Sequence, residues 1–258
     1  MDLELTGHRV ILTGAAAGIG LETARAFVAE GAWVAICDFD GSVVASLADS
    51  DPTILAYVCD VADRKMTAEF VARSTRKMGG LDTLVNNAGI AGPTGPVEDI
   101  SPEEWDRCIA VCLTGQFNAV RAAVPSLRLS GNPSIINMSS LAGRLGFRLR
   151  TPYAAAKWGV IGLTRSLSIE LGPSGIRVNA VIPGLVAGDR QKRVLQAKAR
   201  RLGSSFSEVE SQAFSYTSIR EYVTPRQIAD QILFLASARG RTISGQAISI
   251  CGDSQMLA

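Results

Sequence analysis

The chain has 258 residues, of which 47% are hydrophobic, and a formal net charge of +2. This length and composition are sufficient for one α/β domain with a large core. The small net charge argues against a general nucleic-acid partner. With a single histidine, His8, the sequence has almost no material for a zinc site or a histidine-based triad, so we expect no metal.

The cysteines and the first residues predict a cytoplasmic protein. The five cysteines are odd in number and none forms a C-x-x-C pair, which is typical of reduced thiols. The first residues, MDLELTGHRV, open acidic and lack the basic-then-apolar plan of a signal peptide. No unbroken apolar run approaches the roughly 18–20 residues of a membrane span, so we expect no membrane partner.

Strand-like and helix-like segments alternate along the whole chain without an internal linker. Short apolar runs predict strands at 9–12, 32–37, 53–58, 81–85, 134–138, 176–181 and 247–251. Helical patterns fill the gaps at about 18–30, 41–49, 63–79, 101–129, 152–172 and 225–237. This alternation predicts an α/β fold, a single-domain doubly wound parallel sheet of the Rossmann-like kind with helices on both faces.

A glycine-rich turn, TGAAAGIG at 13–20, joins the first strand to the first helix. Gly14, Gly18 and Gly20 allow the backbone to turn tightly and to approach a pyrophosphate, which then lies at the helix N-terminus. Glycine-rich strand–helix turns also occur without a ligand. The position after an N-terminal strand nevertheless favours a dinucleotide site.

Asp38 ends the second predicted strand, 20 residues after Gly18. A carboxylate there accepts hydrogen bonds from the adenosine ribose hydroxyls and repels a 2′-phosphate. No arginine or lysine lies among residues 15–17, and Phe39 follows the aspartate. We therefore predict NAD rather than NADP as the cofactor.

The stretch from Ser140 to Lys157 is expected to carry the chemistry. Tyr153 and Lys157 are four residues apart in a run that favours helix, so both side chains lie on one helical face. Thr151 is the cap candidate of this helix, and Pro152 lies in its first turn. A neighbouring ammonium favours the charged form of a phenol, whose ordinary pKa is about 10. Tyr153 is thus a candidate general base.

These motifs, together with NNAG at 86–89 and Ser140 placed 13 residues before Tyr153, closely resemble those of the NAD-preferring short-chain dehydrogenases/reductases. The resemblance implies an NAD-dependent alcohol dehydrogenase or ketone reductase of the EC 1.1.1 type. Tyr153 would exchange a proton with the substrate oxygen, and Lys157 would lower the tyrosine pKa and hold the nicotinamide ribose. Ser140 would hydrogen-bond the substrate oxygen, with Ser139 as the competing serine.

The resemblance also implies the cofactor site and the assembly. Asp60 and Val61 would border the adenine, NNAG the ribose, and IPGLV at 182–186 the nicotinamide. Ordinary turn chemistry is the alternative for NNAG and IPG. A homotetramer would pack through the helices at 101–129 and 152–172. The implied cofactor-binding residues are Gly14, Ala17, Gly18, Ile19, Gly20, Asp38, Asp60, Val61, Asn87, Ala88, Gly89, Tyr153, Lys157, Pro183, Gly184 and Val186.

Three positions depart from the family's pattern. Cys112 stands where most relatives carry an asparagine that helps to position a water in a proton relay. A thiol is a weak donor and acceptor, although the main-chain carbonyl at 112 could still hold the water. Cysteine in an apolar helical run is usually inert core. Gly188 replaces a common threonine and Cys251 a frequent aspartate, and neither change removes a catalytic group.

The segment at about 185–223 is expected to cover the substrate as a lid. Its stretch 189–203 carries six basic residues against one aspartate. On a helix, Leu195, Ala199 and Leu202 share one face, and the arginines at 190, 193, 200 and 201 share the opposite one. A solvated lid surface is the plain interpretation of such a charged face.

Further arginines crowd the loop between Ser140 and Tyr153, next to the same expected pocket. Guanidinium groups recognise carboxylate, phosphate or sulfonate through paired hydrogen bonds. We therefore expect a small-molecule substrate with an anionic group, such as a sugar acid or another hydroxy acid. The candidate substrate-binding residues are Arg144, Arg148, Arg150, Arg190 and Arg193.

Two other functions stay open. The 3-oxoacyl-thioester reductases of the same family dock acidic carrier protein on a basic face, but they generally prefer NADP, against which Asp38 argues. A nucleotide-binding sensor or scaffold with little turnover is supported only by the missing asparagine at 112. The intact Ser140, Tyr153 and Lys157 oppose it.

Overall fold

A computed structural model describes residues 2–257 and shows one sheet of seven parallel strands. The strand order is β3-β2-β1-β4-β5-β6-β7, and every neighbouring pair is parallel. This confirms the predicted doubly wound α/β fold. The strands are β1 (Arg9–Thr13), β2 (Trp33–Asp38), β3 (Ile54–Val58), β4 (Thr83–Asn86), β5 (Ser134–Met138), β6 (Arg177–Pro183) and β7 (Ala247–Ile250).

Helices follow most strands, at nearly the predicted positions. Ser101 and Thr224 each form a capping box with the residue three positions on, which explains why α4 and α9 begin where they do. The helices are α1 (Gly18–Ala29), α2 (Gly41–Ser50), α3 (Arg64–Met78), α4 (Pro102–Ile109), α5 (Gly115–Leu127), α6 (Thr151–Leu171), α7 (Asp189–Leu202), α8 (Phe206–Ser215) and α9 (Pro225–Ala236).

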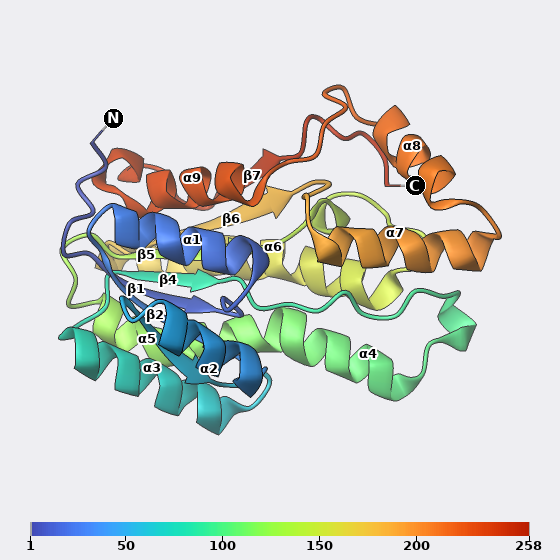
Figure 1. Ribbon diagram of the computed structural model, residues 1–258. Coiled ribbons are helices and arrows are strands. Elements are labelled where there is room, and N and C mark those ends of the chain that lie inside the picture. Colours follow the sequence, from blue (N-terminus) through green and yellow to red (C-terminus); the bar gives the residue numbers. More distant parts are fainter. Residues whose placement is uncertain (1, 258) are drawn as a thin grey trace.

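Side chains alternate between two cores, one on each face of the sheet, because a strand has a period of two. Val10 and Leu12 of β1 pack with α1, α2 and α9, whereas Ile11 packs on the other face with α3 and α5. Figure 1 shows these two layers, with α1 and α9 on one side of the sheet and α3 and α5 on the other. Both faces of every central strand are therefore buried, as the apolar strand sequences require.

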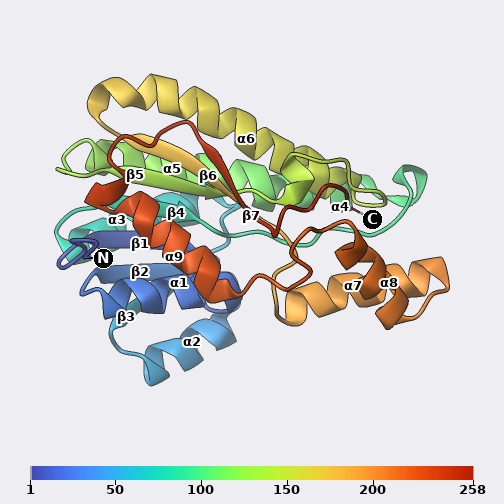
Figure 2. The same ribbon diagram turned by 90° about the horizontal axis from the view of Figure 1, so that it is seen from above.

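The strand order reverses between β1 and β4. Sheets of this kind bind ligands outside the carboxyl ends of their strands at such a switch point. Figures 1 and 2 show α7 and α8 beyond the same end of the sheet. The two helices share a small apolar core of Leu195, Ala199 and Val209, with Phe206 packed against it. Leu202 is exposed, contrary to the expected face, because it lies in the last turn of α7, just before the left-handed Gly203.

The predicted helix at 101–129 is interrupted. A π-helical turn, Ala110–Thr114, separates α4 from α5, and the helix ends at Leu127. By length and composition the whole stretch Pro102–Leu127 could cross a membrane, although half of its most apolar window is buried inside the protein. The sequence expectation missed this stretch because polar residues interrupt the apolar ones along it.

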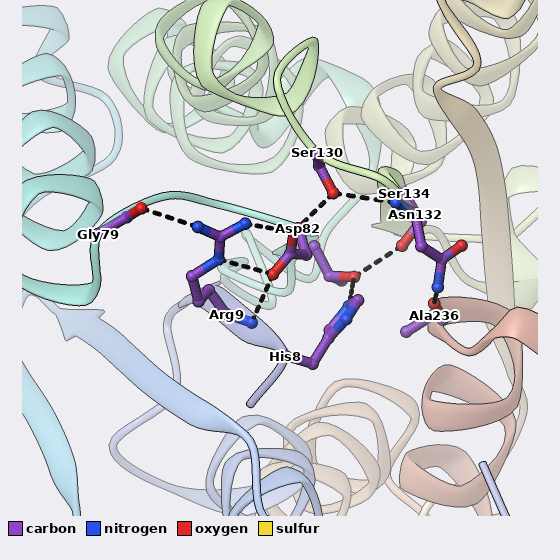
Figure 3. Close-up of polar contacts among 9 residues, drawn as sticks. His8, Arg9, Gly79, Asp82, Ser130, Asn132, Ser134 and Ala236 are labelled. Atoms are coloured by element: carbon purple, nitrogen blue, oxygen red, sulfur yellow. Dashed lines mark hydrogen bonds and ion pairs between the residues drawn. The ribbon is translucent and has the colours of Figure 1, made fainter. Parts of the chain in front are cut away.

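A polar cluster joins β1, β4 and the segment before β5 at the amino end of the sheet (Figure 3). Asp82 accepts hydrogen bonds from the Arg9 Nη2 (2.7 Å) and Nε (2.8 Å) atoms and from the Ser130 hydroxyl (2.6 Å). The His8 Nε2 atom lies 2.8 Å from the Thr83 hydroxyl. His8 thus belongs to a structural network at the end opposite to the expected site.

Candidate active site

The carboxyl ends of the strands open into one long cavity of about 820 Å³. Its walls come from the turns after β1, β2, β4, β5 and β6, from the start of α6 and from α7. All the implied cofactor-binding residues and all three proposed catalytic residues line it. The sheet therefore brings together implied cofactor-binding residues that are up to 172 positions apart, from Gly14 to Val186.

The glycine-rich turn fits a pyrophosphate. Gly14 has φ of +60°, and a Cβ there would lie 2.5 Å from the Ala88 Cα atom. A Cβ on Gly20 would lie 2.6 Å from the side-chain Nδ2 atom of Asn87. No side chain caps the N-terminus of α1, where Ala17 is the N-cap residue. The first amide groups of α1 are thus left for an anionic ligand, as the positive end of a helix favours.

Asp38 lies at the end of β2 with its carboxylate at the cavity wall. Its oxygens accept long hydrogen bonds from the amide nitrogens of Ala16 (3.3 Å) and Asp40 (3.4 Å). A carboxylate has about four acceptor positions, so capacity remains for ribose hydroxyls. Farther along the wall, Asp60 forms an ion pair with Arg107 at 2.7 Å.

The turn after β4 is held by an asparagine amide, and the turn after β6 packs so closely that Gly184 has no room for a side chain. The Asn87 amide donates to the carbonyl oxygens of Thr13 (3.1 Å) and Gly14 (2.6 Å), which ties the NNAG turn to the glycine-rich turn. A Cβ on Gly184 would lie 2.7 Å from the Cys251 Cα atom. Cys251 therefore packs directly beneath the IPG turn.

Ser140 lies in the turn after β5, and Tyr153 and Lys157 lie in the first two turns of α6. The Lys157 ammonium is buried, donates to the Met138 carbonyl at 2.8 Å and lies 5.6 Å from the centre of the Tyr153 ring. The structure distinguishes the two serines. The Ser139 hydroxyl donates to the Lys157 carbonyl at 2.8 Å and is thereby fixed in the core. The Ser140 hydroxyl accepts from the Ala142 amide (3.2 Å), which leaves its hydrogen for a ligand.

Helix α6 begins one residue earlier than predicted. Its first residue is Thr151, and Arg150 is the N-cap residue with no side-chain capping bond. Thr151 is therefore not the cap. Pro152 keeps its place in the first turn, which its fixed φ favours. Leu149, the residue before the N-cap Arg150, has a left-handed backbone with φ of +65°. This conformation costs energy for a side chain of this size.

Cys112 lies in the π-helical turn and faces the cavity end of β4. Its sulfur accepts from the Ile90 amide and donates to the Ile90 carbonyl, both at 3.4 Å. A hydrogen bond with Cys108 lowers the pKa of the Cys112 thiol, burial opposes this, and the charge of Lys157 assists it. The thiol is thus a hydrogen-bonding group as well as core packing.

The cavity wall includes three of the five arginines proposed to bind substrate, namely Arg150, Arg190 and Arg193. Arg190 donates to the Gly89 carbonyl at 3.1 Å, which connects α7 to the turn after β4. The other two do not line the cavity. Arg144 donates to the Ser249 hydroxyl at 2.8 Å, and Arg148 is exposed.

Residues that the sequence did not single out also form the wall. Arg107 holds Asp60, Phe147 lies beside the catalytic helix, and Leu257 reaches the cavity from the C-terminal tail, where its backbone pairs with that of Phe147. No local pattern marks these positions, because they meet the cavity only through tertiary packing. Within residues 2–257, no group of three or more histidine, cysteine or carboxylate side chains is arranged to hold a metal ion.

Comparisons with known proteins relate the chain to nicotinamide-dependent oxidoreductases. The sequence model of a family described as enoyl-(acyl carrier protein) reductase matches residues 14–252. The trans-4-hydroxycyclohexanecarboxylate dehydrogenase of Sinomonas cyclohexanicum is 37% identical, over 94% of this chain and 90% of its own. The 3-oxoacyl-(acyl-carrier-protein) reductase of Thermotoga maritima is 38% identical, over 97% of this chain and 98% of its own.

Solved structures show the same fold with two different cofactors. An NAD⁺-bound xylitol dehydrogenase superposes with a TM-score of 0.91 at 28% identity, covering 96% of this chain and 99% of its own. A variant of the actinorhodin polyketide ketoreductase with NADPH superposes with a TM-score of 0.88 at 30% identity, covering 95% and 96%. The fold accommodates either nicotinamide dinucleotide.

Proposed function

Because the chain belongs to the short-chain dehydrogenase/reductase family, we propose that it is an NAD(H)-dependent oxidoreductase that interconverts a secondary alcohol and a ketone. The observation that carries this proposal is the convergence of Ser140, Tyr153 and Lys157 on one cavity wall, with the buried Lys157 ammonium beside the tyrosine ring. Bound NAD would supply the hydride acceptor, and its reduced form the donor.

The chain's own residues supply acid–base catalysis and orientation. The Tyr153 phenolate oxygen takes the proton of the substrate alcohol, and in reduction the Tyr153 hydroxyl gives that proton to the ketone oxygen. The Ser140 hydroxyl donates a hydrogen bond to the same oxygen as its charge changes. Lys157, held by the Met138 carbonyl, places a positive charge beside the tyrosine. The same groups serve both directions, so the site defines a reaction class.

NAD is proposed over NADP because the Asp38 carboxylate at the cavity wall would repel a 2′-phosphate, and because residues 15–17 are alanines and offer it no cation. The glycine-rich turn and the open N-terminus of α1 would hold the pyrophosphate.

An anionic substrate is supported by the arginines of the cavity wall and by one relative whose name specifies a hydroxy carboxylate. A compact hydroxy acid or oxo acid would suit this wall. The segment at 185–223, with α7 and α8, would close over it as a lid. Reduction of a 3-oxoacyl thioester is the second candidate, because the Thermotoga maritima relative bears that activity in its name.

The test combines binding and turnover. Tyr153→Phe should lower the turnover of secondary alcohols with NAD by two to four orders of magnitude, the range for a lost general base, while NAD binding stays near wild type. Tyr57→Phe, which removes a hydroxyl outside the cavity, is the matched control. Titrations should show NADP binding at least tenfold, or about 1.4 kcal/mol, more weakly than NAD. Wild-type turnover by Tyr153→Phe would disprove the mechanism.

A further inference from the structure

Arg150 is a buried cation with an incomplete set of partners. Its side chain is only 3% exposed, and its Nη2 atom donates to the Ala91 carbonyl. The Nε and Nη1 atoms are shielded from solvent and have no hydrogen-bond partner within the described residues. A buried donor without a partner destabilises the folded state, and a buried charge does so more strongly.

A second buried arginine shows what a structural role looks like in this protein. Arg177 is 6% exposed, but its two terminal nitrogens donate to the carbonyls of Leu235, Ala236, Ser237 and Gly240 and to the Asn132 side chain. It joins β6 to the end of α9 and lies outside the cavity wall. Arg150 differs in both respects, because it lines the cavity and most of its donors are free.

No carboxylate of residues 2–257 forms an ion pair with Arg150. Its guanidinium carbon lies 5.2 Å from the centre of the Tyr153 ring and 5.3 Å from that of Phe147. Burial lowers the pKa of the Arg150 guanidinium. Tyr153 and the thiols of Cys108 and Cys112 oppose this, the charge of Arg190 adds to it, and neither thiol is hydrogen-bonded to Arg150. Aromatic faces stabilise a cation only modestly compared with an anion.

The backbone also favours an anion at this point. Arg150 is the N-cap residue of the 21-residue helix α6, so a cation lies at the positive end of a helix dipole, where a negative charge is preferred. Leu149 is held in a left-handed conformation immediately before it, and its carbonyl accepts from the Gly95 amide at 3.0 Å. Backbone strain of this kind occurs at ligand clamps.

We infer that Arg150 is the receptor for a carboxylate of the substrate. Whichever hydrogen of Nη2 the Ala91 carbonyl takes, one two-donor edge of the planar guanidinium stays open, and this edge matches the two oxygens of a carboxylate. The inference rests on the proposed function, because it identifies the substrate of that same cavity. Since Nε and Nη1 are shielded, the acid binds with a small shift of the Phe147 ring that covers the guanidinium.

The position of Arg150 also limits the size of the substrate. The guanidinium stacks on the ring of Tyr153, whose hydroxyl handles the reacting proton, so the carboxylate and the reacting carbon belong to one compact molecule. A hydroxy acid or oxo acid with a few bonds between the two groups meets this requirement. An acyl thioester on a carrier protein does not, because it carries no charge near its ketone.

The test is calorimetric binding of cyclohexanecarboxylate and of cyclohexanecarboxamide, a neutral molecule of nearly the same shape, with NAD present and absent. Neither probe has a hydroxyl group, so the measurement does not depend on turnover. We expect the acid to bind the wild-type protein at least tenfold more tightly than the amide, or about 1.4 kcal/mol. Arg150→Met should remove this preference, whereas Arg148→Gln, a change of an exposed arginine in the same loop, should keep it.

Thermal stability separates a ligand receptor from a structural residue. Arg150→Met should keep or raise the melting temperature, because it removes a buried, poorly partnered charge. Arg177→Met should lower it, because it leaves several carbonyls unpaired. Equal binding of acid and amide to the wild-type protein would overturn the inference whatever the variants do. It would leave the proposed function standing, since that depends on the turnover of secondary alcohols and on Tyr153.

Discussion

The thiol of Cys112 stands where the family resemblance leads us to expect an asparagine, and it makes a paired contact with the backbone of Ile90. The Cys112 sulfur accepts a hydrogen bond from the Ile90 amide and donates one to the Ile90 carbonyl. These two contacts hold the backbone of the turn that contains Gly89 and Ile90. The Cys112 carbonyl accepts a long hydrogen bond from the Gln116 side chain, at 3.4 Å. Because the main-chain carbonyl is present whatever the side chain, a water relay through it would not depend on the thiol.

A substitution of Cys112 tests whether the thiol serves packing while the main-chain carbonyl serves the water relay. Cys112→Ala should cost less than about tenfold in kcat, or about 1.4 kcal/mol of barrier, because the carbonyl remains. The matched control is Cys37→Ala, which removes a buried thiol outside the cavity wall. A loss of several orders of magnitude in a variant that still folds and binds NAD would give the thiol a chemical role. Alkylation of Cys112 should be slow in the folded protein, because the side chain is buried.

The convergence of Ser140, Tyr153 and Lys157 on one cavity could be predicted from the sequence, but the distinction among the arginines could not. Tyr153 and Lys157 share a helical face by spacing alone, and Ser140 follows a buried strand. Arg148 and Arg150 are two residues apart in one irregular loop, yet one is exposed and the other is buried against the Tyr153 ring. The difference depends on the left-handed backbone of Leu149 and on Phe147, which no local pattern specifies.

At the scale of the elements, the polar cluster at the amino ends of β1 and β4 makes stability depend on pH. Burial by itself would raise the pKa of Asp82, but hydrogen bonds from Arg9 and Ser130 outweigh it and leave a pKa of about 2. Burial lowers the pKa of His8 from its ordinary 6.5. For both residues the pKa in the folded state lies below the pKa in the unfolded state. Their contributions to the free energy of unfolding are therefore present at neutral pH and are lost as the pH falls.

Acid should therefore weaken the protein in two steps. The His8 contribution is lost as the pH falls below about 6.5, and the Asp82 contribution as it falls from about 4 to 2. The shift of Asp82 corresponds to about 2 kcal/mol of unfolding free energy. Urea titrations should show that the gap between wild type and Asp82→Asn shrinks by most of this amount between pH 5 and 2. Asp51→Asn, which breaks an exposed ion pair with Arg25, should show no such convergence. A constant gap for Asp82→Asn would contradict the assignment.

The bounds of helices and strands were predicted well where the spacing of apolar residues determines them. They were predicted less well where the hydrogen-bond register of the backbone determines them. The strand at 134–138 matches β5 at both ends, because a short apolar run has only one way to be buried in a parallel sheet. The π-helical turn Ala110–Thr114 could not be predicted, because a change of hydrogen-bond register leaves the apolar composition of a helix unchanged. The predicted start of α6 differs by one residue from the observed start. Threonine is a residue type that favours the N-cap position, but Thr151 is the first residue of the helix itself.

For the molecule taken as one unit, the alternation of strands and helices was sufficient to predict the parallel sheet and the end of it at which the cavity opens. The contacts of the C-terminal tail after β7 were not predicted from the sequence. Leu257 reaches the cavity, and the Gln255 amide donates to the Tyr216 carbonyl at 2.8 Å, which ties the tail to the segment after α8. Such contacts join residues far apart in the chain and leave no periodic signal.

The outer faces of α5 and α6 bear on the proposed homotetramer. Phe117 of α5 is 45% exposed, and Trp158 and Ile169 of α6 are 52% and 78% exposed. Large exposed aromatic and branched side chains on neighbouring helices are typical of a surface that another protein covers. We therefore propose that subunits of a homotetramer contact each other through these two helices.

Sedimentation of the wild-type protein at micromolar concentration should show a tetramer, because burying these side chains on four subunits removes a large apolar area from water. Trp158→Glu combined with Ile169→Glu should produce a smaller species, since each buried charge would lack a partner. Trp33→Glu is the control, because Trp33 is 60% exposed at the start of β2, outside α5 and α6. A wild-type monomer, or a double variant that remains tetrameric, would show that these helices do not form the interface.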